Sequence, residues 1–197
     1  EAKVFYTSGR NEFRNKGVDL YVKSLGKLNS KLKQEGSKKD IINLFLIPIG
    51  DFELDERLES DLPEDMKSKL WDVAPLSTHK VPMDNEIISA FVREGLMNKA
   101  NDRVKVVLVP VYLDGNDGVF NKNYYKVVEG MDLGVFASYY EPWGYTPLES
   151  ISYGVPTITS DLAGFGRAVL SEYGGNKTGV KVLKRMGVSD EDAIDEL

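Results

Sequence analysis

Apolar residues along the chain fall into short, nearly continuous runs separated by stretches with helical spacing. Six runs predict strands, which are residues 3–9, 41–50, 104–110, 133–139, 155–161 and 178–183. Between the first two runs, apolar residues recur at helical spacing from Val18 to Leu32, and the pattern ends near Gly36. Strands therefore alternate with helices along the chain.

Strands without a polar alternation predict a parallel sheet, because a strand buried on both sides has apolar residues on both faces. We therefore expect an α/β fold with a doubly wound, Rossmann-like parallel sheet, formed by residues 1–197 as one domain. The acidic stretch 51–69 has only a weak helical pattern and is interpreted as an excursion from the sheet. Ser189 is expected to cap a last helix that stops after about two turns at Leu197, which indicates a fragment.

The composition of the 197 residues narrows the class of protein. The formal net charge is −6, which argues against broad binding to nucleic acid but leaves room for a local basic pocket that binds an anion. The chain has no cysteine, so disulfides and thiolate metal sites are excluded. No apolar run approaches the roughly 18 residues of a membrane span, and no leader pattern is visible. We expect a cytoplasmic protein without a membrane partner.

Two loops carry the candidate chemistry, because ligands of open parallel sheets bind beyond the carboxyl ends of the strands. The run YYEPWGYTPLE (139–149) predicts a helix with Thr146 as N-cap, Pro147 at the first helical position and Glu149 three residues after the cap. The N–H groups of Gly144, Tyr145 and Thr146 would then gather at a helix N-terminus, where a phosphate is favoured.

The second loop follows the first strand and places Arg10, Arg14 and Lys16 before the next helix. Three cations at the carboxyl end of a strand in an acidic chain favour an anion site. Each feature also has a purely structural interpretation. Glu149 can be only a helix cap, Glu141 only a solvated acid, and the loop after the first strand only a solvated surface.

The run YYEPWGYTPLE closely resembles the E-x7-E signature of the eukaryotic-type glycogen synthases, which are retaining glycosyltransferases of the GT-B architecture. GRNEFRNKGVDLYVKSLGKLN is similar to the segment that opens their C-terminal domain, and APLSTHKV, DRVKVVLVP and DLAGFG follow in the family's order. The resemblance covers most of the chain. It implies the C-terminal, sugar-nucleotide-binding half of such an enzyme, without the N-terminal domain that supplies the acceptor site.

The resemblance also implies roles for nine residues. Arg10 and Lys16 match cations that contact the donor diphosphate, Glu141 matches an acid near the sugar hydroxyls, and Glu149 matches an acid associated with the ribose. These four residues are the expected catalytic set. The expected donor-binding residues are Tyr124, which would stack on the uracil, Trp143 and Gly144 at the glucosyl unit, and Tyr145 and Thr146 at the distal phosphate.

The implied reaction is the transfer of glucose from UDP-glucose to the non-reducing end of an α-1,4-glucan, with retention and without a metal or other cofactor. The isolated chain is expected to bind the donor but not to elongate glycogen. Relatives carry a longer helical insertion, used in oligomer contacts, where this chain has residues 51–72. Two alternatives stay open: a GT-B enzyme of the sucrose or trehalose synthase type, and a nucleotide-sugar-binding module without catalysis.

Other conspicuous residues favour structural roles. His79 is the only histidine and is expected to be hydrogen-bonded within the fold. Trp71 and Phe91 are expected in the core. Gly164 and Gly166 are interpreted equally well as turn residues and as ligand contacts, and the acidic tail from Asp190 to Glu196 as a solvated helix face.

Overall fold

The computed structural model describes residues 2–58, 75–82, 84–174 and 179–197. These residues contain a six-stranded sheet in which all strands are parallel, in the order β3-β2-β1-β4-β5-β6. The strands are β1 (Lys3–Ser8), β2 (Ile41–Leu46), β3 (Val104–Val109), β4 (Leu133–Val135), β5 (Thr157–Ser160) and β6 (Val180–Leu183). Each strand lies within a predicted run, so the predicted doubly wound parallel sheet is confirmed.

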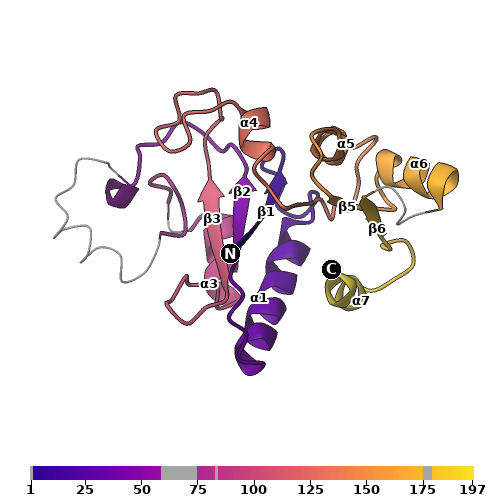
Figure 1. The fold of residues 1–197 in the computed structure, drawn as a ribbon, viewed down its shortest axis with the longest axis horizontal. Coiled ribbons are helices and arrows are strands. Elements are labelled where there is room, and N and C mark those ends of the chain that lie inside the picture. Colours follow the sequence, from indigo (N-terminus) through magenta and orange to yellow (C-terminus); the bar gives the residue numbers. More distant parts are fainter. Residues whose placement is uncertain (1, 59–74, 83, 175–178) are drawn as a thin grey trace.

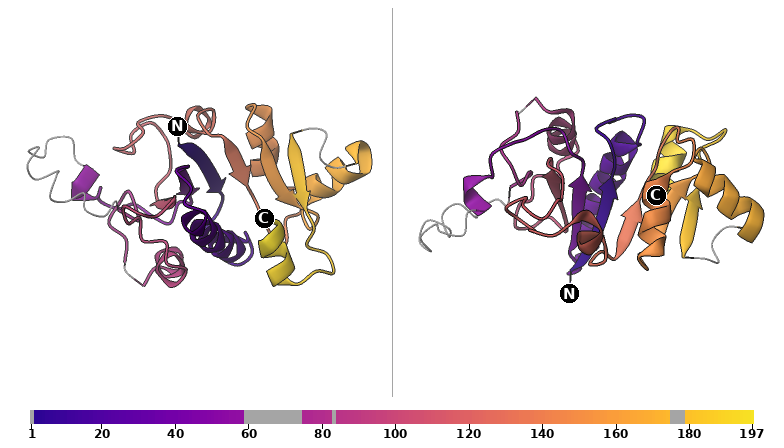
Figure 2. Two further views of the ribbon diagram at one scale, coloured as in Figure 1. Left: turned by 60° about the horizontal axis from the view of Figure 1, so that its bottom comes forward. Right: turned by 90° about the horizontal axis from the view of Figure 1, so that it is seen from above.

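Helices cover both faces of the sheet, as Figures 1 and 2 show. One face is covered by α1 (Val18–Gln34), α3 (Glu86–Arg93) and α7 (Asp190–Glu196), and the other by α4 (Tyr124–Val128), α5 (Tyr145–Ser152) and α6 (Gly164–Tyr173). A short 3-10 helix occupies Glu56–Leu58. None of the helices in the described ranges is long and apolar enough to cross a membrane.

The largest part of the core lies between the sheet and helices α1 and α3. Phe45 of β2 packs edge-on against Phe91 of α3 with ring centroids 4.9 Å apart, and both residues are fully buried. On the other face, Tyr6 of β1 packs edge-on against Phe136 at 5.6 Å. The expected core position of Phe91 is confirmed, whereas Trp71 lies outside the described residues.

The sheet reverses its winding at β1, and this reversal places the site. Strand β1 pairs along its whole length with β2 and only at Phe5 and Tyr6 with β4. The helices on the two sides of this junction lie on opposite faces of the sheet, and ligands of open α/β sheets bind beyond the strand ends at such a reversal. Both loops singled out in the sequence begin here.

The segment after β2 leaves the sheet and returns to its edge. Leu54 forms a bridge with His79, and Ser77 forms one with Leu108 at the β3 edge. His79 is buried with Nδ1 2.8 Å from the Thr78 hydroxyl, and burial lowers its pKa. This environment supports the structural role expected for His79. The excursion predicted for residues 51–69 is described only as far as residue 58.

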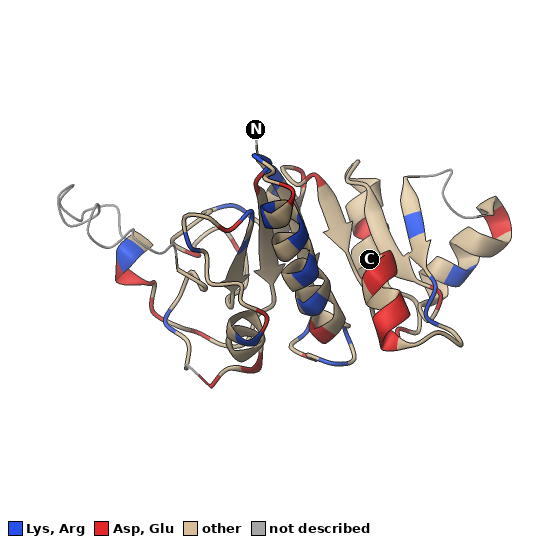
Figure 3. Cartoon of the chain, turned by 90° about the horizontal axis from the view of Figure 1, so that it is seen from below, with Lys and Arg blue, Asp and Glu red and all other residues tan. Residues whose placement is uncertain are grey.

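The start of α7 confirms the prediction made from its cap. The Ser189 hydroxyl accepts a hydrogen bond from the Asp192 N–H at 3.1 Å. The acids of this helix, however, are not simply a solvated face. Lys27 of α1 pairs with Asp195 at 2.7 Å and with Glu191, and Figure 3 shows this acidic helix beside the basic side of α1.

The start of α5 differs from the prediction. The N-cap is Gly144 rather than Thr146, and no side chain caps the helix. Gly144 has φ 99°, a left-handed backbone that glycine adopts without strain and that turns the chain into the helix two residues early. Glu149 therefore does not lie three residues after the N-cap, so it cannot be the acidic partner in a capping box. Its carboxylate instead accepts a hydrogen bond from the Tyr125 hydroxyl at 3.3 Å.

We predict that Phe91→Ala lowers the free energy of unfolding by about 3–5 kcal/mol, because it removes a fully buried ring and leaves a cavity. Its neighbour Val92 is 44% exposed, so Val92→Ala should cost well under 1 kcal/mol. Denaturant titrations of both variants measure the difference. Equal losses for the two variants would contradict this packing.

We also predict that Glu149→Gln changes the free energy of unfolding by no more than about 0.5 kcal/mol, because the helix it belongs to has no side-chain cap. Ser189→Ala removes a true capping hydrogen bond and should cost about 0.5–2 kcal/mol. Thermal or urea unfolding of the two variants provides the comparison. A larger loss for Glu149→Gln would restore the capping-box interpretation.

Candidate functional site

A cleft of ≈ 390 Å³ lies at the carboxyl ends of the strands. Its walls come from the ends of β1, β2 and β3 and from the helices that follow the third and fourth strands. The lining residues are Ser8, Gly9, Arg10, Asn11, Leu46, Pro48, Val111, Tyr112, Leu113, Tyr124, Thr146 and Glu149. The cleft therefore brings together four of the nine residues expected from the sequence, namely Arg10, Tyr124, Thr146 and Glu149.

The loop after β1 supplies the positive charge of the site. Arg10 lines the cleft, its side chain is 76% exposed, and it pairs with Glu12 at 3.0 Å. Since most of its guanidinium faces water, it is free to turn toward an anion in the cleft. The remainder of the loop leads to Lys16, which is much less exposed.

Lys16 and Glu141 form an ion pair that joins the two predicted loops. The Lys16 ammonium donates to Glu141 Oε2, and the two side chains are only 15% and 20% exposed. A partly buried pair is screened less by solvent than an exposed one, so the attraction between these two groups is stronger than in an exposed pair. The structure thus brings together the expected diphosphate cation and the expected sugar-binding acid, which are 125 residues apart in the sequence.

Arg14 does not join Arg10 and Lys16 at an anion site. Its guanidinium lies 3.8 Å from Asp19 and 3.9 Å from Asp190, and over the Tyr139 ring at 5.0 Å. The structure therefore does not bring the three cations of this loop together at one place. Carboxylates from α1 and α7, which the local sequence does not reveal, hold the middle cation.

Tyr124 begins α4 and forms one wall of the cleft. Its hydroxyl lies 2.7 Å from the Ser8 hydroxyl, which anchors the ring against the end of β1. Burial, with a smaller contribution from Tyr6, raises the pKa of Tyr124 far above its ordinary value, so the hydroxyl stays protonated at neutral pH. The neighbouring Tyr125 instead stacks on Tyr153 with ring centroids 5.0 Å apart.

The N-terminus of α5 borders the cleft through Thr146. Tyr145 and Thr146 are the first two helical residues, so their N–H groups have no acceptor within the helix. Together with the helix dipole, these groups favour an anion. Trp143 and Tyr145 are 39% and 69% exposed and lie outside the cleft lining. The indole of Trp143 packs edge-on against Phe165 at 6.2 Å.

Backbone contacts fix the acidic loop against the next one. The N–H of Gly164 donates to the Glu141 carbonyl at 3.1 Å, and the N–H of Phe165 donates to the Trp143 carbonyl at 2.7 Å. Gly164 is the first residue of α6. These bonds favour the interpretation of Gly164 as a turn residue that supports the site.

The sequence interpretation missed Tyr112, which lines the cleft with 77% of its surface exposed. An aromatic ring this exposed at the mouth of a cleft is suited to contact a planar ligand. Tyr112 could have been found from its position two residues after a predicted strand, because residues that follow a strand lie at the edge of the sheet where ligands bind.

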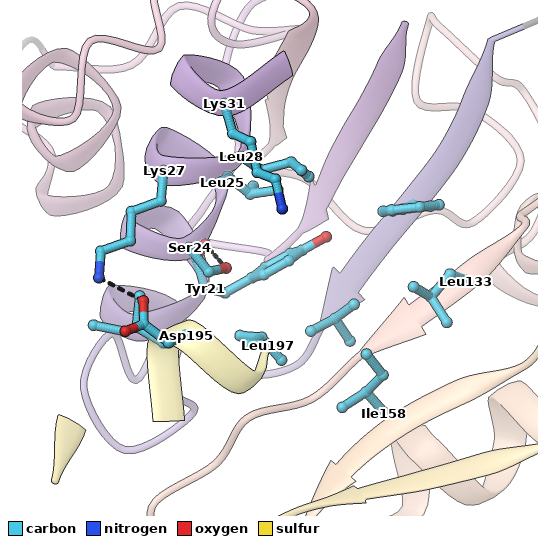
Figure 4. A pocket seen from close by; sticks show the side chains of 13 residues that line it. Tyr21, Ser24, Leu25, Lys27, Leu28, Lys31, Leu133, Ile158, Asp195 and Leu197 are labelled. Atoms are coloured by element: carbon cyan, nitrogen blue, oxygen red, sulfur yellow. Dashed lines mark hydrogen bonds and ion pairs between the residues drawn. The ribbon is translucent and has the colours of Figure 1, made fainter. Parts of the chain in front are cut away.

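A second cavity, of ≈ 460 Å³, is larger but lies elsewhere. It is enclosed by α1, α7 and the sheet, with leucines of α1 and Ile158 among its apolar lining and the Lys27–Asp195 pair at its rim (Figure 4). None of the nine expected site residues lines it. The cleft at the strand ends is therefore the candidate site, since it contains expected residues and lies where open α/β sheets bind their ligands.

In the described part of the chain, no group of three or more His, Cys, Asp or Glu side chains is placed to hold a metal ion. Arg10 and the N-terminus of α5 offer positive charge at the cleft, and Lys16 lies beside the cleft residue Gly9 without lining the cleft itself.

Solved structures share this fold over nearly the whole chain. Trehalose-6-phosphate synthase OtsA matches with a TM-score of 0.54 and 12% identity, over 98% of this chain and 33% of that chain. A UDP-forming α,α-trehalose-phosphate synthase from Burkholderia xenovorans matches with a TM-score of 0.54 and 11% identity, over 99% and 36%. At these identities the likeness concerns the fold, which is that of one half of a GT-B glycosyltransferase.

Sequence relatives are closer. The glycogen [starch] synthase of Neurospora crassa is 32% identical over 98% of this chain and 35% of its own length. The liver glycogen [starch] synthase of Homo sapiens is 30% identical over 98% of this chain and 34% of its own length. This chain thus spans about a third of the length of these relatives. The sequence model of the glycogen synthase family matches residues 1–73 and 65–197. The chain belongs to the glycogen synthase family.

Proposed function

We propose that this chain is the donor-binding half of a glycogen synthase, which transfers glucose from UDP-glucose to the non-reducing end of an α-1,4-glucan with retention. Family membership supports the reaction. The observation that carries the proposal for the site is the single cleft that collects Arg10, Tyr124 and Glu149 from three distant segments. An N-terminal domain would bind the glucan, and the enzyme would act in the cytoplasm.

The cleft offers a place for each part of the donor. The uracil would stack on Tyr124, with Tyr112 at the opening. The ribose would lie at Glu149, whose carboxylate can accept from a hydroxyl while it keeps its bond with Tyr125. The diphosphate would lie between Arg10 and the free N–H groups at the start of α5.

In the site without a ligand, the positive charge of Lys16 and the negative charge of Glu141 compensate each other. A bound diphosphate competes with Glu141 for the Lys16 ammonium, because phosphate oxygens are strong acceptors of charge-assisted hydrogen bonds. The released carboxylate of Glu141 can then accept from hydroxyls of the glucosyl unit. Donor binding would in this way exchange one ion pair for two substrate contacts.

We further propose an internal-return mechanism. The bond between the anomeric carbon and the phosphate oxygen breaks with its electron pair left on UDP, and the acceptor hydroxyl bonds to the same face of the sugar. The proton of that hydroxyl passes to the departing phosphate oxygen. Lys16, Arg10 and the N-terminus of α5 stabilise the negative charge that develops on UDP, so no metal ion is required.

We predict that Tyr124→Ala weakens UDP binding by about 1–3 kcal/mol, the range for stacking of a base on an aromatic side chain. Tyr112→Ala should also weaken UDP binding, with little loss of stability because the ring is 77% exposed. Tyr173→Ala is the control, since that ring lies on α6 outside the cleft lining and is 56% exposed. Calorimetry that shows equal UDP affinity for a folded Tyr124→Ala variant and the wild type would remove the stacking role.

We predict that, in the full-length enzyme, wild-type protein transfers labelled glucose from UDP-glucose to glycogen, and that Glu141→Gln lowers kcat by about 10²-fold or more. This is the scale for loss of a group that stabilises the transition state. Glu172→Gln makes the same chemical change at an exposed position of α6 and should leave kcat unchanged. The purified 197-residue chain should bind UDP without elongating glycogen.

The choice of acceptor separates the proposal from its alternatives. Transfer to a free sugar phosphate instead of glycogen would favour the trehalose synthase type, and UDP binding without transfer by the full-length protein would favour a binding module. Wild-type kcat in Glu141→Gln would show that this residue is only a solvated loop acid.

A further inference from the structure

A cluster of charged side chains surrounds Tyr139, just beyond the cleft. Tyr139 stands four residues after the end of β4 and two residues before Glu141. Its N–H donates to the carbonyl of Asn15 at 2.9 Å, and Asn15 directly precedes Lys16. One backbone hydrogen bond therefore joins the loop of the site cation to the loop of the site acid.

A second backbone contact lies on the other side of Lys16. Gly17 has φ 68°, and a Cβ built on it would lie 2.0 Å from the Ala137 carbonyl oxygen. Any side chain at this position would push the two loops apart. The backbone on both sides of Lys16 is thus held against residues 137–139, which lead to Glu141.

The ring of Tyr139 receives two cations. The guanidinium of Arg185 lies over the ring at 4.0 Å and that of Arg14 at 5.0 Å. A guanidinium above an aromatic face is attracted by its negative charge distribution, most strongly where water is excluded. The Arg185 side chain is only 3% exposed, so this contact is largely desolvated.

Two carboxylates close the network. The Tyr139 hydroxyl donates to Asp190 at 2.8 Å and to Asp19 at 3.4 Å. Asp190 also lies 3.3 Å from Arg185, and Asp19 lies at the start of α1, where burial raises its pKa against the opposing effect of Arg14. The network joins the loop after β1, the starts of α1 and α7, and the end of β4.

The Arg185 guanidinium is buried with part of its hydrogen-bonding capacity unused. Its Nε and Nη1 have no hydrogen-bond partner among the described residues, whereas its backbone N–H donates to Asp161 at 2.8 Å. Since unsatisfied buried donors of a cation are unfavourable for stability, the contacts of this guanidinium with the Tyr139 ring and with Asp190 help to hold it in place. Tyr139, which also bonds Asp190, connects these contacts to the loop that leads to Glu141.

We propose that Tyr139, held by Arg14 and Arg185, is a positioning residue that sets Lys16 and Glu141 in one geometry for the donor diphosphate. This inference rests on the proposed function. Tyr139, Arg14 and Arg185 do not line the cleft, whereas a Cβ built on the cleft residue Gly9 would lie 3.6 Å from the Lys16 side chain. The cluster therefore acts through Lys16 and its partner Glu141 and not by contact with the donor. Arginine suits the task better than lysine, because its planar group stacks on a ring while it pairs with a carboxylate.

The test measures steady-state kinetics of the full-length enzyme and calorimetric binding of UDP and of uridine. Tyr139→Leu, which removes the ring and the hydroxyl, should lower kcat and UDP affinity by about tenfold, because a small misplacement of a charged group is costly. Uridine, which lacks the diphosphate, should bind with unchanged affinity. Arg185→Lys should keep more activity than Arg185→Gln.

A double-mutant cycle with Lys16→Ala separates positioning from general damage to the fold. If Tyr139 acts through Lys16, adding Tyr139→Leu to Lys16→Ala should lower UDP affinity no further. Phe91→Leu, a core change on another part of the sheet, is the control for lost stability and should leave kcat and the UDP-to-uridine affinity ratio unchanged.

Additive effects in the cycle, an equal loss of uridine and UDP affinity, or wild-type behaviour of Tyr139→Leu would each overturn the positioning role. A wild type that binds UDP but transfers no glucose would overturn the proposed reaction alone, and the UDP and uridine measurements would still decide the role of Tyr139. A wild type that binds neither nucleotide nor nucleoside would overturn both.

Discussion

The pairing of β1 with both β2 and β4 is the constraint on which the site depends. All six strands are parallel, so every loop that leaves a carboxyl end emerges at the same edge. The winding reverses at β1, and ligands of open α/β sheets bind beyond the strand ends at such a reversal. The short contact between β1 and β4, at Phe5 and Tyr6, fixes how far apart the cation loop and the acid loop begin.

Two groups of charges lie beyond this junction. The first is the Lys16–Glu141 pair, which is largely shielded from water and can exchange partners when an anion arrives. The second group contains Arg14, Arg185, Asp19 and Asp190 around Tyr139. Since the charges of the second group compensate one another and the Tyr139 N–H is bonded to the loop of Lys16, the first pair can change partners while its support stays in place.

The strands could be predicted because burial on both faces leaves a continuous apolar run, a local signal that packing does not override. The start of α5 could not be predicted in this way. The Thr-Pro-x-Glu pattern suggests a capping box, but it is also compatible with a helix that begins earlier, at a left-handed Gly144. The pairing of Lys16 with Glu141 depends on strand order and not on spacing. For the same reason, the pairing of Arg14 with acids of α1 and α7 could not be predicted from the local sequence.

The register of the sheet also bears on the order in which the molecule assembles. Strands β1 and β2 are joined by one helix, whereas Phe5 of β1 must find Leu133 of β4 across more than half of the chain. Closing so long a loop is slow relative to forming local contacts. The cleft exists only after that step, and a nucleotide that binds there stabilises only the assembled sheet. Ligand binding would therefore protect the pairing of β1 with β4 against opening. This pairing joins the two halves of the sheet, and its two strands are far apart in the sequence.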